Sequence, residues 1–348
     1  MNPFILSTLL FALGLGTMIT FTSTHWLLAW MGLEINTLAI IPLMTKNHHP
    51  RAVEAATKYF LTQATAAAMV LFASVSNAWL TSQWDINQLN HPLPTTLITL
   101  ALALKIGLAP LHTWMPEVLQ GLDLITGLIL STWQKLAPFC LMLQLSFTNQ
   151  NLLVFLGLTS MLVGGWGGLN QTQLRKILAY SSIAHLGWMM LILQFSPSIS
   201  LMTLSLYLVM TSSLFLTFKI NNSMTINSLA TSWAKVPALT SILPFTLLSL
   251  GGLPPLTGFM PKWMILTELS KQGIGLAATI AALSALLSLY FYLRLSYAMT
   301  LTMSPHNLTG TLSWRLQPKH LTLPLAILTT TTICLLPLTP ATMSIFTL

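Results

Sequence analysis

Four charged side chains stand inside otherwise apolar stretches of this sequence. Glu34 lies in HWLLAWMGLEINTLAIIPLM, Lys105 lies in LALALKIGLAPLHTWMPEVL, and Lys135 and Lys262 lie in two further apolar runs. Desolvation weakens the preference of a lysine or a glutamate for its charged form, so such groups can exchange protons. A row of them is the chemistry of a proton relay. The alternative is a set of structural ion pairs that fix helix packing, although intramembrane ionisable groups are usually functional.

Two histidines extend this set of candidates. His185 lies in RKILAYSSIAHLGWMM, with Ser181 and Ser182 one helical turn before it on neighbouring parts of one face. We interpret these groups as a proton wire in preference to a packing histidine with hydroxyl neighbours. His112 follows a proline in KIGLAPLHTWMP, where it could relay protons or cap backbone carbonyls. The sequence favours neither role for His112.

The composition indicates that these residues lie in a membrane. Only 6% of the 348 residues are charged and 54% are hydrophobic, against about a quarter charged in soluble domains. Runs of roughly 20 apolar residues span a bilayer as helices. The sequence predicts an all-α polytopic membrane protein with about eleven spans, at 3–21, 25–44, 58–79, 95–120, 122–145, 150–169, 175–195, 198–219, 237–270, 274–299 and 323–345.

The depth of the charged groups follows from these spans. Glu34 is the tenth residue of a span that begins at His25, which places it about 14 Å from that end of the helix. Lys105 and Lys135 lie near the middle of their own runs. Because a lysine stem reaches only about 6 Å, snorkelling to the interface is not expected at this depth.

The basic residues outside the spans predict the orientation. Ten of them fall in loops on the side of the N-terminus, and only Lys271 falls on the other side. The ten are Lys46, Arg51, Lys58, Arg175, Lys176, Lys219, Lys235, Arg294, Arg315 and Lys319. The net charge of +8 is therefore a topology signal and gives no support to nucleic-acid binding. The N-terminus has neither a basic leader nor an Arg-rich amphipathic helix, so we expect the first span to be retained.

Two spans carry helix-breaking residues near their centres. In the fourth span Pro110 removes a backbone hydrogen bond and Gly107 loosens the same turn, beside Lys105. The ninth span, LSLGGLPPLTGFMPKWMIL, has an equivalent cluster, which consists of Gly251, Gly252, Pro254 and Pro255. Unwound backbone at membrane depth is tolerated where it lines a cavity or is buried in protein. We therefore expect two broken helices.

The two breaks belong to an internal repeat. GLAPLHTWMPE aligns with GLPPLTGFMPK at an offset of 145 residues, and six of the eleven positions are identical. A shift of five spans inverts the second copy relative to the membrane, and inverted repeats with broken helices are typical of ion pathways. We predict one five-helix repeat over 1–145, an inverted repeat over 146–299, and a loop with one extra C-terminal helix over 300–348.

Several other classes of site lack support. Cys140 and Cys334 show no metal-like spacing, so the sequence gives no basis for a zinc or iron–sulfur site. GGWGG at 164–168 lacks the lysine of a phosphate loop and favours close helix packing. We expect no cofactor and no metal in this chain.

The segments ALKIGLAPLHTWMPEV, WQKLAP, LRKILAYSSIAHLGW and LGGLPPLTGFMPKW resemble the antiporter-like membrane subunits of proton-pumping NADH:ubiquinone oxidoreductase, complex I, and above all the animal mitochondrial ones. The similarity covers essentially the whole chain, which starts at what would be the fourth span of bacterial relatives. The resemblance implies that Glu34 pairs with Lys105, that Lys135 bridges, that Lys262 is the terminal lysine, and that His185 belongs to the central hydrophilic axis.

The resemblance also implies the setting. NADH, FMN, iron–sulfur clusters and ubiquinone are expected in partner subunits, and the partners are other membrane-arm subunits, including other antiporter-like chains, together with lipids. The location implied is the mitochondrial inner membrane, with the N-terminus in the matrix and the C-terminus in the intermembrane space. Two alternatives stay open: a freestanding cation/proton antiporter, and a passive scaffold whose buried charges only fix helix packing.

Overall fold

The chain folds into helices connected by short loops. The computed structural model describes residues 2–46, 48–89, 91–145, 150–234, 236–302 and 322–347. Within these ranges every regular element is a helix, and β contacts are limited to the isolated bridges His25–Asp85 and Gln173–Thr225. Helices prevail because a bilayer offers the backbone no water, so each N–H and C=O must be satisfied within the protein. The all-α membrane fold is confirmed.

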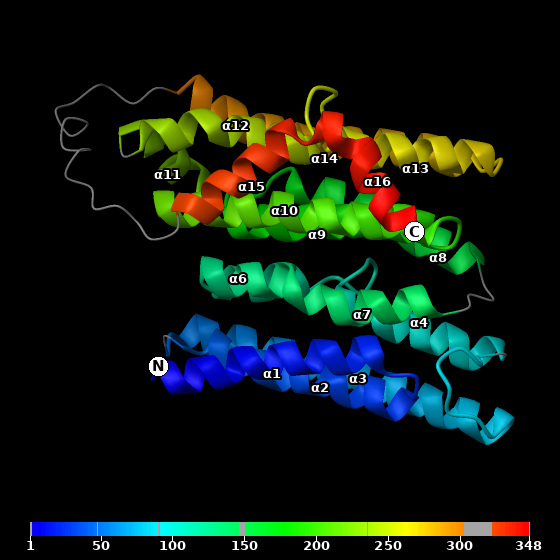
Figure 1. Cartoon of the computed structure of the whole chain (residues 1–348). Helices are drawn as coiled ribbons and strands as arrows, with labels where there is room; N and C mark the ends of the chain where they lie inside the picture. The colour runs from blue at the N-terminus through cyan, green and yellow to red at the C-terminus, as the bar shows by residue number, and fades with distance from the viewer. Residues whose placement is uncertain are drawn as a thin grey trace. The chain divides into compact units, whose positions relative to one another are not determined.

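The chain divides into two compact units, Met1–Leu153 and Val154–Leu348 (Figure 1). The first unit contains α1 (Pro3–Thr22), α2 (Trp26–Met44), α3 (Pro50–Thr81), α4 (Pro92–Ile106), α5 (Trp114–Gly121), α6 (Leu124–Ser131) and α7 (Trp133–Gln144). The second contains most of α8 (Gln150–Gly168), then α9 (Leu174–Leu193), α10 (Pro197–Asn221), α11 (Ile226–Ala230), η1 (Thr231–Ala234), α12 (Pro237–Gly251), α13 (Phe259–Lys271), α14 (Gly275–Thr300), α15 (Thr322–Cys334), η3 (Leu336–Leu338) and α16 (Thr339–Thr347).

Each unit packs its helices around its own broken helix. In the first unit α1, α2 and α3 lie side by side (Figure 1). Helix α3 also contacts both halves of the broken pair, α4 and α5. In the second unit α14 packs against both α12 and α13, and α10 contacts α9, α12 and α15. Both breaks are therefore covered by helices from their own unit.

The helices account for the expected spans. Eight helical segments of the described chain are long and apolar enough to cross a membrane, and the pair α15 and α16, bent by 72°, makes a ninth. The broken pairs α4 with α5 and α12 with α13 add two more, since each half alone is too short. The sum of nine and two equals the eleven predicted spans.

Both predicted breaks occur, and their backbones match. Each helix ends at a left-handed glycine, Gly107 with φ of +87° and Gly252 with φ of +79°. In each case the N–H of this glycine and that of the next residue donate to the same carbonyl, on Ala103 in one break and on Leu248 in the other. Such a bond pattern closes a helix end.

The two broken helices begin and break at equivalent positions of the repeat. α4 and α12 both begin at a proline and contain 15 residues, and α5 and α13 begin at Trp114 and Phe259. All these bounds differ by 145 residues, the offset of the sequence repeat. The unwound segments hold Pro110 on one side, and Pro254 and Pro255 on the other. The inversion of the second repeat stays a prediction.

Close helix packing explains the glycine-rich segment of α8. A Cβ on Gly164 would lie 2.7 Å from the backbone nitrogen of Ala184 in α9. A side chain at this position would therefore push α8 away from the part of α9 that carries His185. The packing interpretation of GGWGG is confirmed at Gly164.

Part of the orientation argument falls outside the described residues. Lys235, Arg315 and Lys319, three of the ten basic residues assigned to the N-terminal side, are among the positions that the structure does not describe. The orientation of the chain therefore stays a prediction.

The glycine that ends α12 gives a first test of the fold. We expect Gly252→Ala to destabilise the protein for two reasons. The left-handed backbone costs an L residue about 1–2 kcal/mol, and the new Cβ would lie 3.0 Å from Nζ of Lys262. Gly273 is a matched control, because its φ is +75° but nothing lies within 4 Å of an added Cβ.

The measurement is the thermal unfolding midpoint of the purified protein in detergent. Gly273→Ala reports the backbone cost alone, and Gly252→Ala should lower the midpoint further because Lys262 must move. Equal midpoints for the two variants would show that Lys262 moves aside without cost.

Candidate functional site

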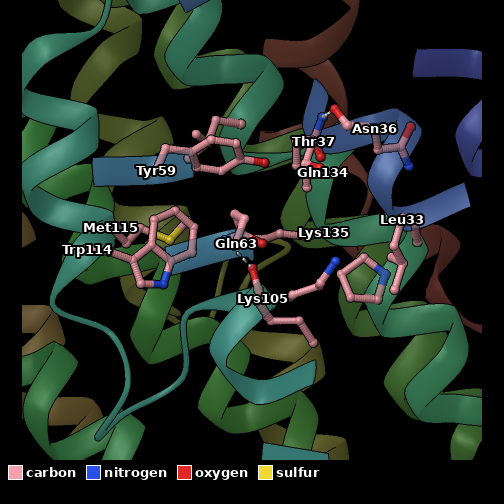
Figure 2. Close-up of a pocket in the computed structure, with 14 residues that line it drawn as sticks. Leu33, Asn36, Thr37, Tyr59, Gln63, Lys105, Trp114, Met115, Gln134 and Lys135 are labelled. Carbon is pink, nitrogen blue, oxygen red and sulfur yellow. Dashed lines mark hydrogen bonds between the residues drawn. The ribbon is translucent and has the colours of Figure 1, made fainter. Parts of the chain in front are cut away.

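A small polar cavity lies beside the first break in the first unit (Figure 2). Lys105 and Lys135, two of the four predicted buried charges, both line it. Five polar side chains from α2, α3 and α7 also line it, together with apolar residues such as Leu33 and Met115. The polar five are Asn36, Thr37, Tyr59, Gln63 and Gln134. Its volume leaves room for roughly one water molecule. The fold thus brings two lysines from separate spans to one cavity.

Lys105 is buried in the last turn of α4. Its side chain is 6% exposed, and Nζ has no hydrogen-bond acceptor among the described residues. Its own carbonyl accepts a long hydrogen bond of 3.5 Å from Nε2 of Gln63, drawn in Figure 2. The preceding carbonyl, on Leu104, accepts from Nε1 of Trp114 at 3.0 Å. Lys105 therefore has a fixed backbone, and its ammonium group faces the cavity.

Glu34 lies on α2, next to the cavity-lining residue Leu33, and is partly buried. Its carboxylate acts electrostatically on Lys105. No contact ion pair joins them in the described part of the chain, however, and Nζ of Lys105 has no hydrogen-bond partner there. Instead the hydroxyl of Thr37 lies 2.9 Å from the backbone carbonyl oxygen of Glu34 and 3.1 Å from its Oε2, so its one proton is shared between these two acceptors. The predicted Glu34–Lys105 pair therefore stays a prediction.

Lys135 enters the cavity from the first turn of α7. Its side chain is only 2% exposed. The span is interrupted at Thr132, between α6 and α7, three residues before the lysine. The adjacent side chain of Gln134 donates to the carbonyl of Asn36 at 3.2 Å, which ties α7 to α2. The position of Lys135 therefore depends on a bond between helices about one hundred residues apart.

In the second unit Lys262 reaches back to the second break. It lies in the first turn of α13, is 9% exposed, and donates from Nζ to the carbonyl of Gly251 at 2.7 Å. Gly251 is the last residue of α12, where the partial negative charge of a helix end favours a cation. Lys105 lies in the last turn of α4, but its Nζ has no acceptor among the described residues. Of the two lysines, Lys262 is thus the one with a hydrogen bond to the C-terminal end of a half-helix.

His185 lies next to a buried tyrosine that sequence reasoning missed. Its ring is 5.7 Å from that of Tyr207 on α10, which is fully buried. The hydroxyls of Ser181 and Ser182, also buried, donate to carbonyls one turn back, on Leu178 and Ala179. Their oxygen lone pairs can still accept a proton or a hydrogen bond. The role of His185 in a proton wire stays a prediction.

His112 lies in the unwound segment of the first break. Its Nδ1 is 3.3 Å from the carbonyl oxygen of Pro110 and can donate to it in the appropriate tautomer. This geometry fits the predicted capping role. Proton transfer by His112, the alternative role, stays a prediction.

Comparison with known proteins gives the family. A family model described as "NADH:quinone oxidoreductase/Mrp antiporter, TM" matches residues 23–288, and one described as "NADH dehydrogenase subunit 2 C-terminus" matches residues 289–343. The NADH-ubiquinone oxidoreductase chain 2 of Tetraodon nigroviridis is 72% identical over 346 residues, which cover 99% of each chain. The chain belongs to the NADH-ubiquinone oxidoreductase chain 2 family.

Two solved structures have a similar fold. A chain of respiratory complex I from Thermus thermophilus with bound aureothin superposes with a TM-score of 0.86 at 26% identity, over 99% of this chain and 80% of that chain. A chain of the Mrp complex from Dietzia sp. DQ12-45-1b superposes with a TM-score of 0.84 at 17% identity, over 97% and 76% of the two chains. The latter similarity concerns the fold alone.

For this member of the chain 2 family, sequence reasoning found the charged groups and missed their neutral neighbours. The structure adds Tyr59, Gln63, Asn36 and Gln134 around Lys105 and Lys135, and Tyr207 beside His185. One signal was available for the tyrosines, since a hydroxyl in an apolar span needs a polar partner. The amides carry the same signal, because an amide in an apolar span also needs a hydrogen-bond partner, but the sequence does not reveal which partner.

Lys262 gives a second prediction, because its bond to Gly251 offers a structural role that competes with proton transfer. Arginine keeps both the charge and the donors, but a guanidinium hardly deprotonates. We expect Lys262→Arg and Lys262→Met to assemble into the complex and both to lower its proton yield. The measurement is the proton-to-electron ratio of the assembled complex in liposomes. A full ratio for the arginine variant would leave Lys262 as a fixed charge.

Proposed function

We propose that this chain moves protons across the membrane through its buried Glu, Lys and His side chains. As a chain 2 family member, it is an antiporter-like membrane subunit of the proton-translocating NADH:ubiquinone oxidoreductase. The observation that carries the residue assignment is the cavity shared by Lys105 and Lys135, with Glu34 beside it and without a contact ion pair. Two buried amines that line one cavity can pass a proton between them, directly or through a water.

The proposed step is electrostatic. The Glu34 carboxylate stabilises the protonated form of Lys105, and when the two groups move apart the ammonium loses that stabilisation. The proton then passes to Lys135 through the cavity, which has room for roughly one bridging water. The bond from Thr37 to Glu34 supports this scheme, because it gives the carboxylate an alternative partner in the separated form.

The onward path leads to the second unit. We infer transfer to Lys262, with His185 and its hydroxyl neighbours as part of the pathway, from the family resemblance of these positions. Burial of Lys262 and the contact of His185 with Tyr207 support the inference. Groups coupled in this way titrate as a set, so no single protonation constant belongs to one of them.

The redox chemistry that drives this transfer is assigned to partner subunits. We propose that NADH, FMN, the iron–sulfur clusters and ubiquinone bind there, and that this chain holds no cofactor of its own. In the described ranges no group of three or more His, Cys, Asp or Glu residues could hold a metal ion.

The proposed partners and location follow from the same assignment. The chain works with other subunits of the complex, and we propose that other antiporter-like chains and lipids are among its direct contacts. We place it in the mitochondrial inner membrane, with the N-terminus in the matrix and the C-terminus in the intermembrane space.

Glu34 and Lys105 give the third prediction. Glu34→Gln removes the negative charge that stabilises protonated Lys105. A loss of ~1.4 kcal/mol of this stabilisation corresponds to a factor of ten, so we expect proton pumping to fall on the order of tenfold with near-normal assembly. Lys105→Met should lower it at least as much. The measurement is the proton-to-electron ratio together with NADH:ubiquinone turnover in liposomes.

The control for this prediction is Glu268→Gln. Glu268 is also partly buried, at 19% side-chain exposure, but its partner is Lys271, outside the cavity. This variant should pump normally. Normal pumping by Glu34→Gln as well would contradict the assignment of Glu34 as an electrostatic switch.

A further inference from the structure

Helix α3 contacts both sides of the first break. The ring of Tyr59 meets the ring of Trp114, which begins α5, at a centroid distance of 5.8 Å and an angle of 61°. One turn further along α3, Gln63 donates to the carbonyl of Lys105, at the end of α4. Continuous α3 thus holds the end of one half-helix and the start of the other.

A charged group on α3 adds a third connection. Nζ of Lys58 lies 2.8 Å from Oε1 of Glu54 and 2.8 Å from Oε2 of Glu117. We refer to these three residues as the Lys58 triad. Glu54 is one turn before Lys58 on the same helix, whereas Glu117 belongs to the first turn of α5. Only the Lys58–Glu117 pair therefore joins two elements.

The same turn of α5 shapes the break. Trp114 donates from Nε1 to the carbonyl of Leu104, and the side chains of Trp114 and Met115 cover Gly107, within 3.3 Å and 3.0 Å of where its Cβ would be. A displacement of α5 would therefore break the bond to the carbonyl of Leu104, which precedes Lys105. It would also uncover Gly107, which follows Lys105. Glu117 is the charged residue of this turn that holds it to α3.

The second break supports the importance of this position. At the repeat offset of 145 residues, Glu117 corresponds to Lys262. Lys262 also ties its half-helix to a neighbour, through the bond to the carbonyl of Gly251. In both copies a charged residue fixes the first turn after the break. Glu117 does so by its ion pair with Lys58, and Lys262 does so by its hydrogen bond to the carbonyl of Gly251.

We propose that the Lys58–Glu117 ion pair positions α5 and thereby sets the geometry of the Lys105 site. Glu117 and Lys58 are positioning residues for proton transfer. The proposal deepens the proposed function and rests on it. Exposed ion pairs contribute little to fold stability, and the side chains of Lys58 and Glu117 are 43% and 53% exposed. The consequence of losing the pair is therefore a change in pumping at nearly constant assembly.

The experiment compares two carboxylates on one lysine. Glu117→Gln and Glu54→Gln each remove one negative charge at 2.8 Å from the same ammonium, and only the first unties α5. Both are introduced into the assembled complex in liposomes, and the proton-to-electron ratio and the turnover are measured. We expect Glu117→Gln to lower proton pumping roughly two- to five-fold, the range that the loss of an exposed ion pair allows. Glu54→Gln should stay close to the unsubstituted complex.

Two further variants test whether charge pairing is the cause. Lys58→Arg keeps the pair and should pump normally, whereas Lys58→Met should match Glu117→Gln. The double variant Lys58→Met with Glu117→Gln should pump as well as either single variant. Each single variant already removes the whole Lys58–Glu117 interaction, so the second substitution removes nothing more. Added salt should weaken pumping by the unsubstituted complex more than pumping by Glu117→Gln.

The outcomes separate this proposal from the proposed function. If Lys105→Met fails to pump while Glu117→Gln and Glu54→Gln behave alike, the positioning pair is refuted and the relay stands. If Lys105→Met pumps normally, the relay is refuted. The positioning role of the Lys58–Glu117 pair is then refuted as well, because it acts through the Lys105 site. An additive double variant would also overturn the proposal, since it would show that Lys58 and Glu117 act separately.

Discussion

The structure depends on the requirement that every backbone group inside a bilayer finds a partner within the protein. A continuous helix meets this requirement by itself, whereas each broken helix exposes carbonyls that need other donors. Trp114 and Gln63 supply donors to the carbonyls of Leu104 and Lys105 at the first break. Lys262 supplies the donor to Gly251 at the second. The residues that permit the break and the residues that stabilise it are therefore different, and both kinds surround the candidate relay.

The same requirement explains how buried cations are tolerated. The C-terminal end of a half-helix carries partial negative charge on its carbonyls, and a cation placed there recovers part of the solvation it has lost. Lys105 reaches such an end from within α4, and Lys262 reaches the equivalent end from the following half-helix. The breaks thus create electrostatic sites in the interior that an unbroken span could not provide. The cavity beside Lys105 and Lys135 adds space for hydration at one of them.

Function and folding place different demands on the charged residues. Glu34, Lys105, Lys135 and Lys262 are in or near the interior, where a fixed charge is costly. Lys58, Glu54 and Glu117 remain exposed and form ion pairs whose energetic contribution is small but whose geometry joins α3 to α5. A proton relay requires the buried charged residues to change partners. In our proposal the exposed ion pair of Lys58 and Glu117 holds α5 in place while they do so.

The sequence by itself determined the spans, the two breaks and the positions of the buried charges. Apolar runs, glycine–proline clusters and isolated charges are local signals, and the repeat offset of 145 residues predicted equal bounds for both broken helices. Only the tertiary structure decided that Lys105 and Lys135 share a cavity, that Tyr207 lies beside His185, and that Lys58 meets Glu117 across 59 residues. The reason is physical. A soluble helix shows its buried face by an apolar stripe, but lipid and protein interior are both apolar, so the sequence of a membrane helix does not reveal which side faces its neighbours.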